Sequence, residues 1–450
     1  MLDSLTVALK DIFKAYDIRG VYPDEIDEVH AHSIGSAFAR FVSTPTLIVG
    51  RDMRLSSPSL SAAFTEGVTG QGVDVVDIGL VSTDALYFAS GRHQLPGAMF
   101  TASHNPGQYN GIKMCLAGAA PVGEETGLAE IRELAGSRLP PAGSTGTVAQ
   151  RDILEDFTEH VLGFVDPAKL RPLKIVIDAA NGMAGKVAPA VFDRLPVEVI
   201  PLYFDLDGTF PNHPADPIQI ENLVELQRVV LESGADLGMA FDGDADRVFL
   251  VDEQAEPVSG SLTTALVASR ILQREQGGSV VHNLICSRVV PESIVENGGQ
   301  PIRTRVGHSF IKKVMAETGA VFGGEHSGHY YFRDNFRADS GLICAMFVLE
   351  ALSAGPDSMS QVLAPLRRYW NSGEINTKVS DQDLKVKQIS EVYAEGEQDW
   401  TDGLTVSYSD WWFNLRGSNT EPLLRLNVEA NGPELGTKKT EELLDIIRQA

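Results

Sequence analysis

Residues 173–185 read LKIVIDAANGMAG, an apolar run that ends in a polar, glycine-containing turn. Continuous runs of valine, isoleucine and leucine of this length are typical of strands buried in a parallel sheet. Apolar residues at helical spacing follow over residues 187–195. The stretch therefore predicts a β-strand followed by an α-helix, which is the building unit of an α/β domain.

Two other stretches share this plan. Residues 45–51 read PTLIVGR and precede a helical pattern over residues 57–69, and residues 279–287 read SVVHNLICS. Three such starts predict three mixed α/β domains of similar topology, although the sequence identity between them is too low to prove a repeat.

The last part of the chain differs. Alternating segments at 404–408, 411–415 and 423–428, and then an amphipathic helix at 435–448, predict a smaller C-terminal α+β domain.

A chain of 450 residues is too long for one typical hydrophobic core. Linker candidates are the Pro/Gly/Ser-rich stretch 136–146 and the polar segments 253–261 and 367–374. Together these features predict four domains, over residues 1–145, 146–253, 254–368 and 369–450.

The composition narrows the class of protein. A hydrophobic content of 43% and a charged content of 22% are ordinary for a globular chain. The net charge of −24 argues against nucleic-acid and anionic-membrane binding, since both need a basic surface. The N-terminal residues do not resemble a signal peptide, and no apolar run approaches the ~20 residues that cross a bilayer. Three widely spaced cysteines suit a reducing compartment. We therefore expect a cytoplasmic protein.

The first motif that carries chemistry is TASHNP, residues 101–106, which continues as GQYNGIKM. It follows an apolar stretch, so Ser103 is expected at the end of a strand, where α/β proteins usually place function. His104 and Asn105 offer hydrogen bonds to a phosphate, and Lys113 follows on the same segment. From local chemistry alone, a polar turn that caps a helix is an equally good interpretation.

The second motif is DGDADR, residues 242–247, between two apolar runs. Asp242, Asp244 and Asp246 at alternate positions form a hard-oxygen site suited to Mg²⁺ or Ca²⁺. An EF-hand is excluded because Arg247 stands where glycine is needed and because the flanks are typical of strands. Three carboxylates also leave room for a phosphate oxygen at the metal. The alternative is a solvated acidic turn.

Two further loops are suited to binding a sugar and a phosphate. GEHSGH, residues 324–329, offers Glu325 and Ser327 between glycines, whereas its two histidines lack the further ligands of a zinc site. RGSNTEP, residues 416–422, has a guanidinium fork and a set of hydroxyl, amide and backbone donors that fit a phosphate: Arg416, Ser418, Asn419 and Thr420. Taken singly, each loop is also compatible with an ordinary turn.

Two shorter segments complete the set. KAYDIRG, residues 14–20, offers Tyr16 and Arg19, and TRVGHSFIKK, residues 304–313, places Arg305 and His308 on a turn before a helix. Such a turn is a favourable setting for an anion, and an ordinary surface turn is the alternative for both.

Together the motifs resemble those of the α-D-phosphohexomutase family, and the resemblance covers almost the whole chain. The stretches that carry it occur in family order: KAYDIRG, VGRDMRLSSP, TASHNPGQYNGIK, DAANGMAG, DGDADR, VGHSFIKK, GEHSGH and RGSNTEP. The resemblance implies three mixed α/β domains and a C-terminal domain around one central cleft. It also implies reversible transfer of a phosphate between carbons 1 and 6 of a hexose, with Mg²⁺ and a hexose 1,6-bisphosphate intermediate.

The resemblance also implies roles for individual residues. Ser103 would carry a phosphoryl group at rest, and Mg²⁺ would be held by Asp242, Asp244, Asp246 and that phosphoserine. Glu325, Ser327 and His329 would hold sugar hydroxyls. The phosphate that does not react would lie against Arg416, Ser418, Asn419 and Thr420. The cleft lining would be completed by Arg247, His308, Tyr16 and Arg19, and Lys113 and His104 would assist proton transfer.

One position departs from the family pattern. Members that accept both mannose and glucose phosphates often carry lysine in the strand before the third-domain turn, where this chain has Ile285, and this favours mannose phosphates. The alternatives are a phosphoglucosamine mutase, a metal-dependent sugar phosphatase and an inactive sugar-phosphate binding protein. The partner is expected to be a hexose phosphate, with no nucleic acid or membrane, and the chain is expected to be a monomer or a homodimer.

Overall fold

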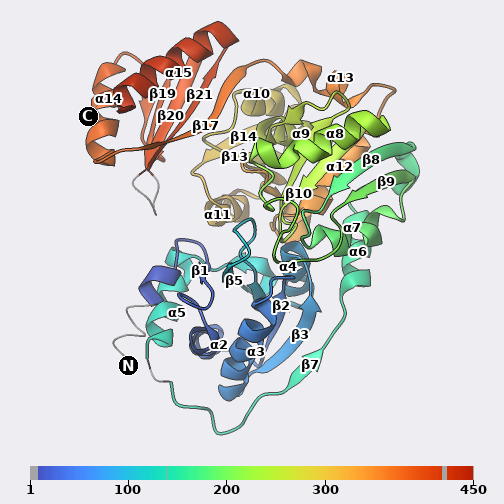
Figure 1. The fold of residues 1–450 in the computed structure, drawn as a ribbon, viewed down its shortest axis with the longest axis vertical. Coiled ribbons are helices and arrows are strands. Elements are labelled where there is room, and N and C mark those ends of the chain that lie inside the picture. The colour runs from blue at the N-terminus through green and yellow to red at the C-terminus, as the bar shows by residue number, and fades with distance from the viewer. Residues whose placement is uncertain (1–8, 138, 418–422, 449–450) are drawn as a thin grey trace.

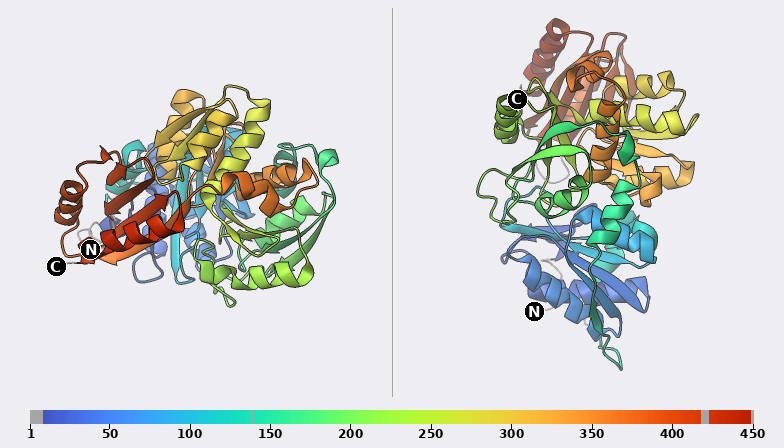
Figure 2. Two further views of the ribbon diagram at one scale, coloured as in Figure 1. Left: turned by 90° about the horizontal axis from the view of Figure 1, so that it is seen from above. Right: turned by 90° about the vertical axis from the view of Figure 1, so that its right-hand side faces the viewer.

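The computed structural model describes residues 9–137, 139–417 and 423–448. Within them, four β-sheets follow one another along the chain. The first three belong to domains I, II and III and the fourth to domain IV. Domain I lies at one end of the molecule and domain IV near the other (Figure 1 and Figure 2, right). The predicted fold class, three mixed α/β domains and a C-terminal α+β domain, is confirmed.

Domains I, II and III repeat one βαβαββ unit. In each, the first strand pairs in parallel with the second and third, and the third pairs antiparallel with the fourth. The strands of domain I are β2 (Thr46–Arg51), β3 (Asp74–Leu80), β4 (Gly97–Phe100) and β5 (Tyr109–Leu116); those of domain II are β8 (Leu173–Asp178), β9 (Val197–Leu202), β10 (Leu237–Phe241) and β11 (Val248–Asp252); those of domain III are β13 (Ser279–Asn283), β14 (Gln300–Thr304), β15 (Phe322–Gly324) and β16 (Tyr330–Phe332).

Helices connect the strands of each unit. They are α3 (Ser57–Gly70) and α4 (Thr83–His93) in domain I, α7 (Ala184–Phe192) and α8 (Val224–Ser233) in domain II, and α10 (Val289–Glu296) and α11 (His308–Thr318) in domain III. Short strands extend the sheets: β1 (Ile18–Val21) and β6 (Ala120–Pro121) pair with β5, β7 (Val148–Gln150) pairs with β3, and β12 (Pro257–Val258) pairs with β11. Further α-helices of the described part of domains I to III are α2 (Glu28–Val42), α5 (Leu128–Ala135), α6 (Leu154–Leu162), α9 (Gly260–Arg274), α12 (Gly341–Ser353) and α13 (Met359–Leu363).

The third and fourth strands of each unit are joined by the loop that carries its motif. These are the Ser103 loop (residues 101–108), the aspartate loop (residues 242–247) and the Glu325 loop (residues 325–329). Each loop follows the carboxyl end of a parallel strand, where open α/β sheets bind their ligands. The repeated topology therefore places all three motifs at the same structural position.

Domain IV is an antiparallel sheet in the order β17-β21-β20-β19-β18. Its elements are β17 (Trp370–Lys378), α14 (Gln382–Val392), β18 (Glu397–Asp399), β19 (Leu404–Ser407), β20 (Trp411–Gly417), β21 (Leu423–Ala430) and α15 (Pro433–Arg448). One continuous core runs through domains I to III and includes helix α12, which is buried over all but its last residue, whereas domain IV has a core of its own around Phe413 and Leu426. Domain IV is therefore a separate packing unit.

Three sequence predictions of element position need correction. The linker candidate 253–261 contains β12 and the first two residues of α9. The helix expected over 187–195 is α7, which begins at Ala184 and ends at Phe192. The linker candidate 367–374 contains the start of β17, an edge strand of domain IV. An edge strand is solvated along one side, so its polar sequence, WNSGEINTK, resembles a linker. None of the helices in the described ranges has both the length and the apolar character that a membrane crossing requires.

His282, the fourth of the five residues of β13, provides a test of the domain III core. Its side chain is buried, and the burial lowers its pKa to about 4, against about 6.5 in an unfolded chain. As pH falls from 6.5 to 4, the unfolded chain binds a proton that folded His282 does not, so stability is lost with falling pH. Relative to His282→Gln, the wild-type free energy of unfolding should fall by about 2 kcal/mol between pH 7 and pH 4.5. A pH-independent difference in urea denaturation would contradict this.

Candidate active site

Ser103 lies at the junction of domains I and II. Its side chain is buried, and its hydroxyl donates to Asp242 Oδ2 at 2.7 Å. His104 Nδ1 is 3.3 Å from the same Oγ, and Arg247 Nη2 is 3.4 Å from it. Ser103 has φ +50°, a left-handed conformation that is rare for residues other than glycine and is characteristic of functional sites. The loop thus presents this hydroxyl to the aspartate loop of the next domain.

The three aspartates converge as their spacing predicts. Asp242, Asp244 and Asp246 are buried, and one carboxylate oxygen from each lies within 4.8 Å of the others. Lys113 Nζ, from β5 of domain I, donates to Asp244 Oδ2 at 2.8 Å and to Asp246 Oδ2 at 2.6 Å. Arg247 Nε donates to Asp242 Oδ2 at 2.9 Å. The cluster therefore joins the two domains by charge.

Burial and charge shift the ionisation of this cluster strongly. Burial raises the pKa of Asp242 to about 8, against the opposing effect of Arg247. Burial also opposes ionisation of Asp244, but Lys113 outweighs it and holds the pKa of that carboxyl below its usual range. Burial disfavours charge on Lys113 as well, yet the two carboxylates raise its pKa well above the ordinary value. Perturbation of this size in a buried cluster is typical of functional sites.

The donor set fits a hard divalent cation. Asp244 Oδ1 and Asp246 Oδ1 are buried and make no hydrogen bond. A buried carboxylate oxygen without a partner is costly unless a cation neutralises it. Three carboxylates supply the oxygen ligands that Mg²⁺ prefers and leave positions for a phosphate oxygen and water. The residues therefore fit the metal that the motif implies.

Arg54, which follows β2, is a site residue that sequence reasoning did not single out. Its buried guanidinium donates to four backbone carbonyls of the Ser103 loop and β5, those of Ser103, Asn105, Pro106 and Tyr109, at 2.7–2.9 Å. Asp52 lies 3.2 Å from Arg54 Nε. Arg54 therefore maintains the strained conformation of Ser103. The sequence indicates Arg54 only through its place in VGRDMRLSSP, a stretch that carries no recognisable chemical motif.

Replacing Arg54 by methionine should destabilise the protein by about 3–5 kcal/mol, because Asp52 would remain buried without its cation and four carbonyls would each lose one donor. Arg51→Met is the matched control. Arg51 is part-exposed and lies 3.4 Å from Asp77, so its loss should cost less than about 1 kcal/mol. Urea or thermal denaturation of both variants measures the difference, and equal effects would exclude the role assigned to Arg54.

Glu325 is a buried residue directly after β15, and its carboxylate accepts three hydrogen bonds. Tyr331 donates its hydroxyl to Oε2 at 2.7 Å, while the Gly307 amide and Asn283 Nδ2 donate to Oε1 at 3.0 Å and 3.2 Å. Its orientation is therefore set by the turn before α11 as well as by its own loop.

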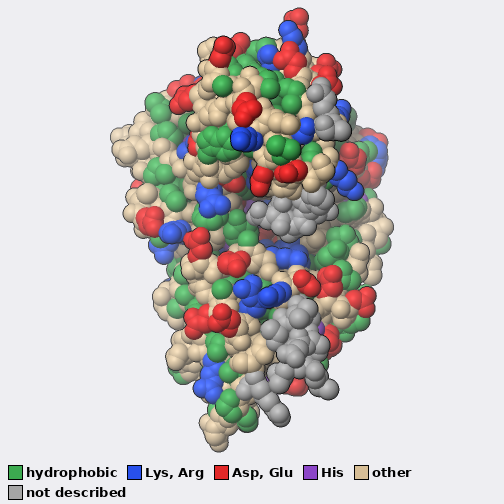
Figure 3. Space-filling view, turned by 90° about the vertical axis from the view of Figure 1, so that its left-hand side faces the viewer, with side chains coloured by type: hydrophobic (Ala, Val, Ile, Leu, Met, Phe, Trp, Pro, Cys, Tyr) green, Lys and Arg blue, Asp and Glu red, His purple; other side chains and the backbone are tan. Residues whose placement is uncertain are grey.

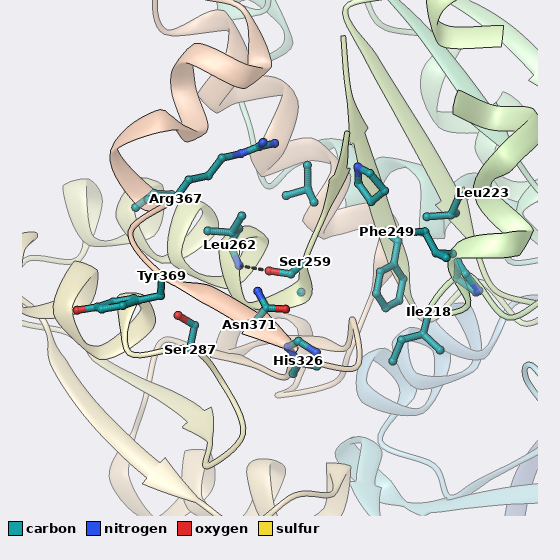
Figure 4. Close-up of a pocket in the computed structure, with 16 residues that line it drawn as sticks. Ile218, Leu223, Phe249, Ser259, Leu262, Ser287, His326, Arg367, Tyr369 and Asn371 are labelled. Atoms are coloured by element: carbon teal, nitrogen blue, oxygen red, sulfur yellow. Dashed lines mark hydrogen bonds between the residues drawn. The ribbon is translucent and has the colours of Figure 1, made fainter. Parts of the chain in front are cut away.

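The two histidines of GEHSGH do not converge. His329 Nδ1 is 3.0 Å from Ser327 Oγ, and its Nε2 is 4.0 Å from Asp246 Oδ1. His326 Nδ1 instead lies 3.2 Å from Ser261 Oγ. Figure 4 shows His326 among the side chains that line a cavity of about 420 Å³ where domains II and III meet the start of β17. His329 thus lies beside Asp246 and Asp339 in a second group of side chains that could hold a metal, whereas His326 lies apart from it.

Tyr16 brings domain I to the turn before α11. Its ring packs against His308 with centroids 5.3 Å apart, and its hydroxyl donates to the Val306 carbonyl at 3.4 Å. His308 is the first residue of α11, and burial together with Lys312 lowers its pKa to about 3, so it is neutral. Arg19 donates to the Asn105 side chain in the Ser103 loop and to Asp17.

The phosphate-binding motif of domain IV is described only in part. Arg416, near the end of β20, donates to Glu374 Oε2 at 2.9 Å, and Ser418, Asn419 and Thr420 lie outside the described residues.

Figure 3 shows Lys and Arg side chains at the hollow between domain I and the domains above it, with acidic side chains spread over the rest of that face. Positive charge is therefore present locally at this hollow although the chain as a whole carries a net charge of −24.

Ile285 lies in the turn after β13 and not in the strand where it was expected, because β13 ends two residues earlier, at Asn283. It is 7% exposed. An alkyl side chain in this position supplies no hydrogen bond to a sugar.

Comparison with known proteins places this geometry in a family. Four family models match in succession: phosphoglucomutase/phosphomannomutase domain I over residues 10–138, domain II over 155–256, domain III over 259–369 and the C-terminal domain over 374–446.

Similar proteins match over nearly the full length. A phosphomannomutase of Salmonella typhimurium is 38% identical over 450 residues and covers 97% of this chain and 99% of its own length. One from Methanocaldococcus jannaschii is 36% identical, covering 97% of each. A crystal structure of a phosphoglucomutase/phosphomannomutase family protein from Burkholderia thailandensis has a TM-score of 0.89 and 33% identity, and it covers 98% of this chain and 97% of that one. The chain belongs to the phosphoglucomutase/phosphomannomutase family.

Proposed function

We propose that the protein is a phosphohexomutase that interconverts mannose 1-phosphate and mannose 6-phosphate through a phosphorylated Ser103. The observation that carries this is the contact of the Ser103 hydroxyl with Asp242 at the edge of a buried three-aspartate cluster. Phosphoryl transfer requires charge neutralisation and alignment, and this arrangement supplies both around one hydroxyl. The names of the relatives support the same reaction.

The reaction consists of two transfers. In the first, the bond between phosphorus and Ser103 Oγ breaks, the O6 hydroxyl of mannose 1-phosphate attacks phosphorus, and its proton passes to a base. The product is mannose 1,6-bisphosphate. After the sugar turns over, Ser103 Oγ accepts the phosphoryl group from O1, and O1 takes a proton. Covalent catalysis thus divides one difficult migration into two ordinary transfers.

The chain's own residues divide this work. Asp242, Asp244 and Asp246 would hold Mg²⁺, which when bound neutralises charge on the transferring phosphoryl group. Arg247 and Lys113 add fixed positive charge, and His104, 3.3 Å from Ser103 Oγ, is placed to move a proton. Glu325, Ser327 and His329 would orient the sugar. Tyr16, Arg19 and His308 would line the cleft, and Arg416 with Ser418, Asn419 and Thr420 would hold the second phosphate.

Mannose is preferred here because Ile285 cannot offer the hydrogen bond that lysine gives in relatives that also accept glucose. Initial rates with mannose 1-phosphate and glucose 1-phosphate in competition, with Mg²⁺ and a bisphosphate primer, test the preference. Faster turnover of glucosamine 6-phosphate would instead identify a phosphoglucosamine mutase. Phosphate release matching sugar turnover would identify a phosphatase.

The location and assembly of the protein are also proposals. The three cysteines are buried and free, which suits a reducing cytoplasm. We expect a monomer or homodimer that acts on small hexose phosphates, and light scattering of the purified chain measures its mass.

A further inference from the structure

The peptide of Val306, in the turn between β14 and α11, is held from two other domains. Its carbonyl accepts from Tyr16 Oη of domain I at 3.4 Å. Its amide donates to Asp402 Oδ2 of domain IV at 3.0 Å. The next amide, that of Gly307, donates to Glu325 Oε1 at 3.0 Å. One short turn of domain III thus connects domain I, domain IV and the Glu325 side chain.

The domain IV side of this contact is built rigidly. Asp402 lies in the turn between β18 and β19, and its carbonyl accepts from Asn414 Nδ2 at 3.1 Å, where Asn414 is a buried residue of β20. Asp399 opens the same turn and accepts from the amide and hydroxyl of Thr401 at 2.8 Å and 2.6 Å. The backbone of Asp402 is therefore held in place by domain IV, and its carboxylate extends from it to the Val306 amide.

Gly307 leaves this turn little freedom on the domain I side. It has φ +129°, which only glycine adopts easily, and a Cβ there would lie 2.7 Å from Tyr16 Oη. Burial and then Asp402 raise the pKa of Tyr16, so the Asp402 charge acts across the turn. A displacement of Val306 would therefore move Gly307 away from Glu325 and His308 away from Tyr16.

We propose that Asp402 is a positioning residue: through the Val306 amide, it makes the placement of Glu325 and His308 depend on domain IV lying against domain III. This inference rests on the proposed function for its effect on sugar binding. Domain IV has a core separate from that of domains I to III, so among the described residues its position affects Glu325 and His308 through surface contacts such as this one. A hydrogen bond to a carboxylate is stronger than one between neutral groups.

Asp402→Ala tests the proposal, with Asp402→Asn as the conservative variant, because asparagine can still accept from Val306. Arg303→Gln is the matched control. It removes the neighbouring contact between domains III and IV, Arg303 Nη1 to Asp399 Oδ2 at 2.6 Å, and leaves the Val306 bond intact. Asp402→Ala should raise KM for mannose 1-phosphate by about tenfold, with kcat changed much less, since Glu325 binds the sugar in both ground and transition states. Asp402→Asn should recover most of the loss, and Arg303→Gln should change KM by less than about threefold.

Amide hydrogen exchange gives a second result that is independent of turnover. Exchange at Gly307, whose amide bonds to Glu325 and not to Asp402, should accelerate in Asp402→Ala and remain unchanged in Arg303→Gln. Unchanged Gly307 exchange and an unchanged KM in Asp402→Ala would overturn the proposal, as would equal effects of Asp402→Ala and Arg303→Gln. Failure of the wild-type enzyme to turn over any hexose phosphate would instead refute the proposed function. The exchange rate at Gly307 would still test whether Asp402 positions this turn.

Discussion

Ser103→Ala should lower mutase turnover by at least about 10³-fold, because no other residue can take over its part in a covalent route. The surrounding polar groups contact this hydroxyl directly: Asp242 accepts a hydrogen bond from it, and His104 and Arg247 lie within hydrogen-bonding distance. The measurement is the initial rate of conversion of mannose 1-phosphate with Mg²⁺ and a bisphosphate primer. Mass spectrometry of the wild type after incubation with the bisphosphate should show one added phosphoryl group on the peptide containing residue 103.

Ser61→Ala is the matched control for this variant. Ser61 is also a buried serine of domain I, but its hydroxyl donates to the Pro58 carbonyl within α3 and contacts no group of the site. Its loss should leave turnover within about twofold of wild type, since a local side-chain hydrogen bond contributes only about 1 kcal/mol to stability. A Ser103→Ala enzyme that retains its rate, or a phosphoryl group found on another residue, would show that Ser103 does not carry the transfer.

The local structure of this site was largely predictable from sequence. The apolar runs before residues 101, 242 and 325 fix strands that end there, and a loop after a parallel strand lies at the binding edge of its sheet. The convergence of Asp242, Asp244 and Asp246 follows from their spacing within one loop. The approach of Lys113 to these aspartates could not be predicted in this way, because it depends on how domains I and II pack together.

Two of the contacts that sequence reasoning missed are made to backbone atoms or across domains. Arg54 binds carbonyl groups that any sequence would supply, so its pattern carries no chemical signal. Asp402 likewise binds the amide of Val306, about a hundred positions away in the chain. The strand β17 was mistaken for a linker because only one of its edges is paired, to β21. Local patterns thus predict the groups that we propose to touch substrate, whereas tertiary packing determines the groups that hold them in place.

Removal of divalent cations should lower turnover by at least about 10²-fold, and added Mg²⁺ should restore it. The charge balance gives the reason. Three carboxylates face two cations, Lys113 and Arg247, at distances of 2.6–2.9 Å, which leaves one negative charge when all are ionised. A phosphoryl group on Ser103 would add a charge of about −1.5 to −2 to this buried space. Such an excess is not stable in a site of low dielectric unless a cation compensates it.

Binding of the metal should also be visible without any turnover. Mg²⁺ at about 100 times its dissociation constant should stabilise the wild type by about 2.7 kcal/mol, seen as a rise in the thermal midpoint. Asp244→Asn should lose both this rise and the metal-dependent rate. Asp178→Asn, a change of another buried aspartate at a strand end of the same sheet, should keep both, because Asp178 bonds to the Ala180 amide and His213 and not to the cluster.

The same charge balance predicts that phosphorylation and metal binding favour each other. A cation near the phosphoserine lowers the cost of its charge, and the phosphate in turn supplies a further oxygen ligand, so the coupling is reciprocal. Mg²⁺ should therefore stabilise phosphorylated wild-type enzyme more than the Ser103→Ala variant, which cannot carry that charge. An equal thermal shift in the two would show that the aspartates bind the metal without the phosphoserine. A rate unaffected by chelation would show that Lys113 and Arg247 neutralise the transferred group by themselves.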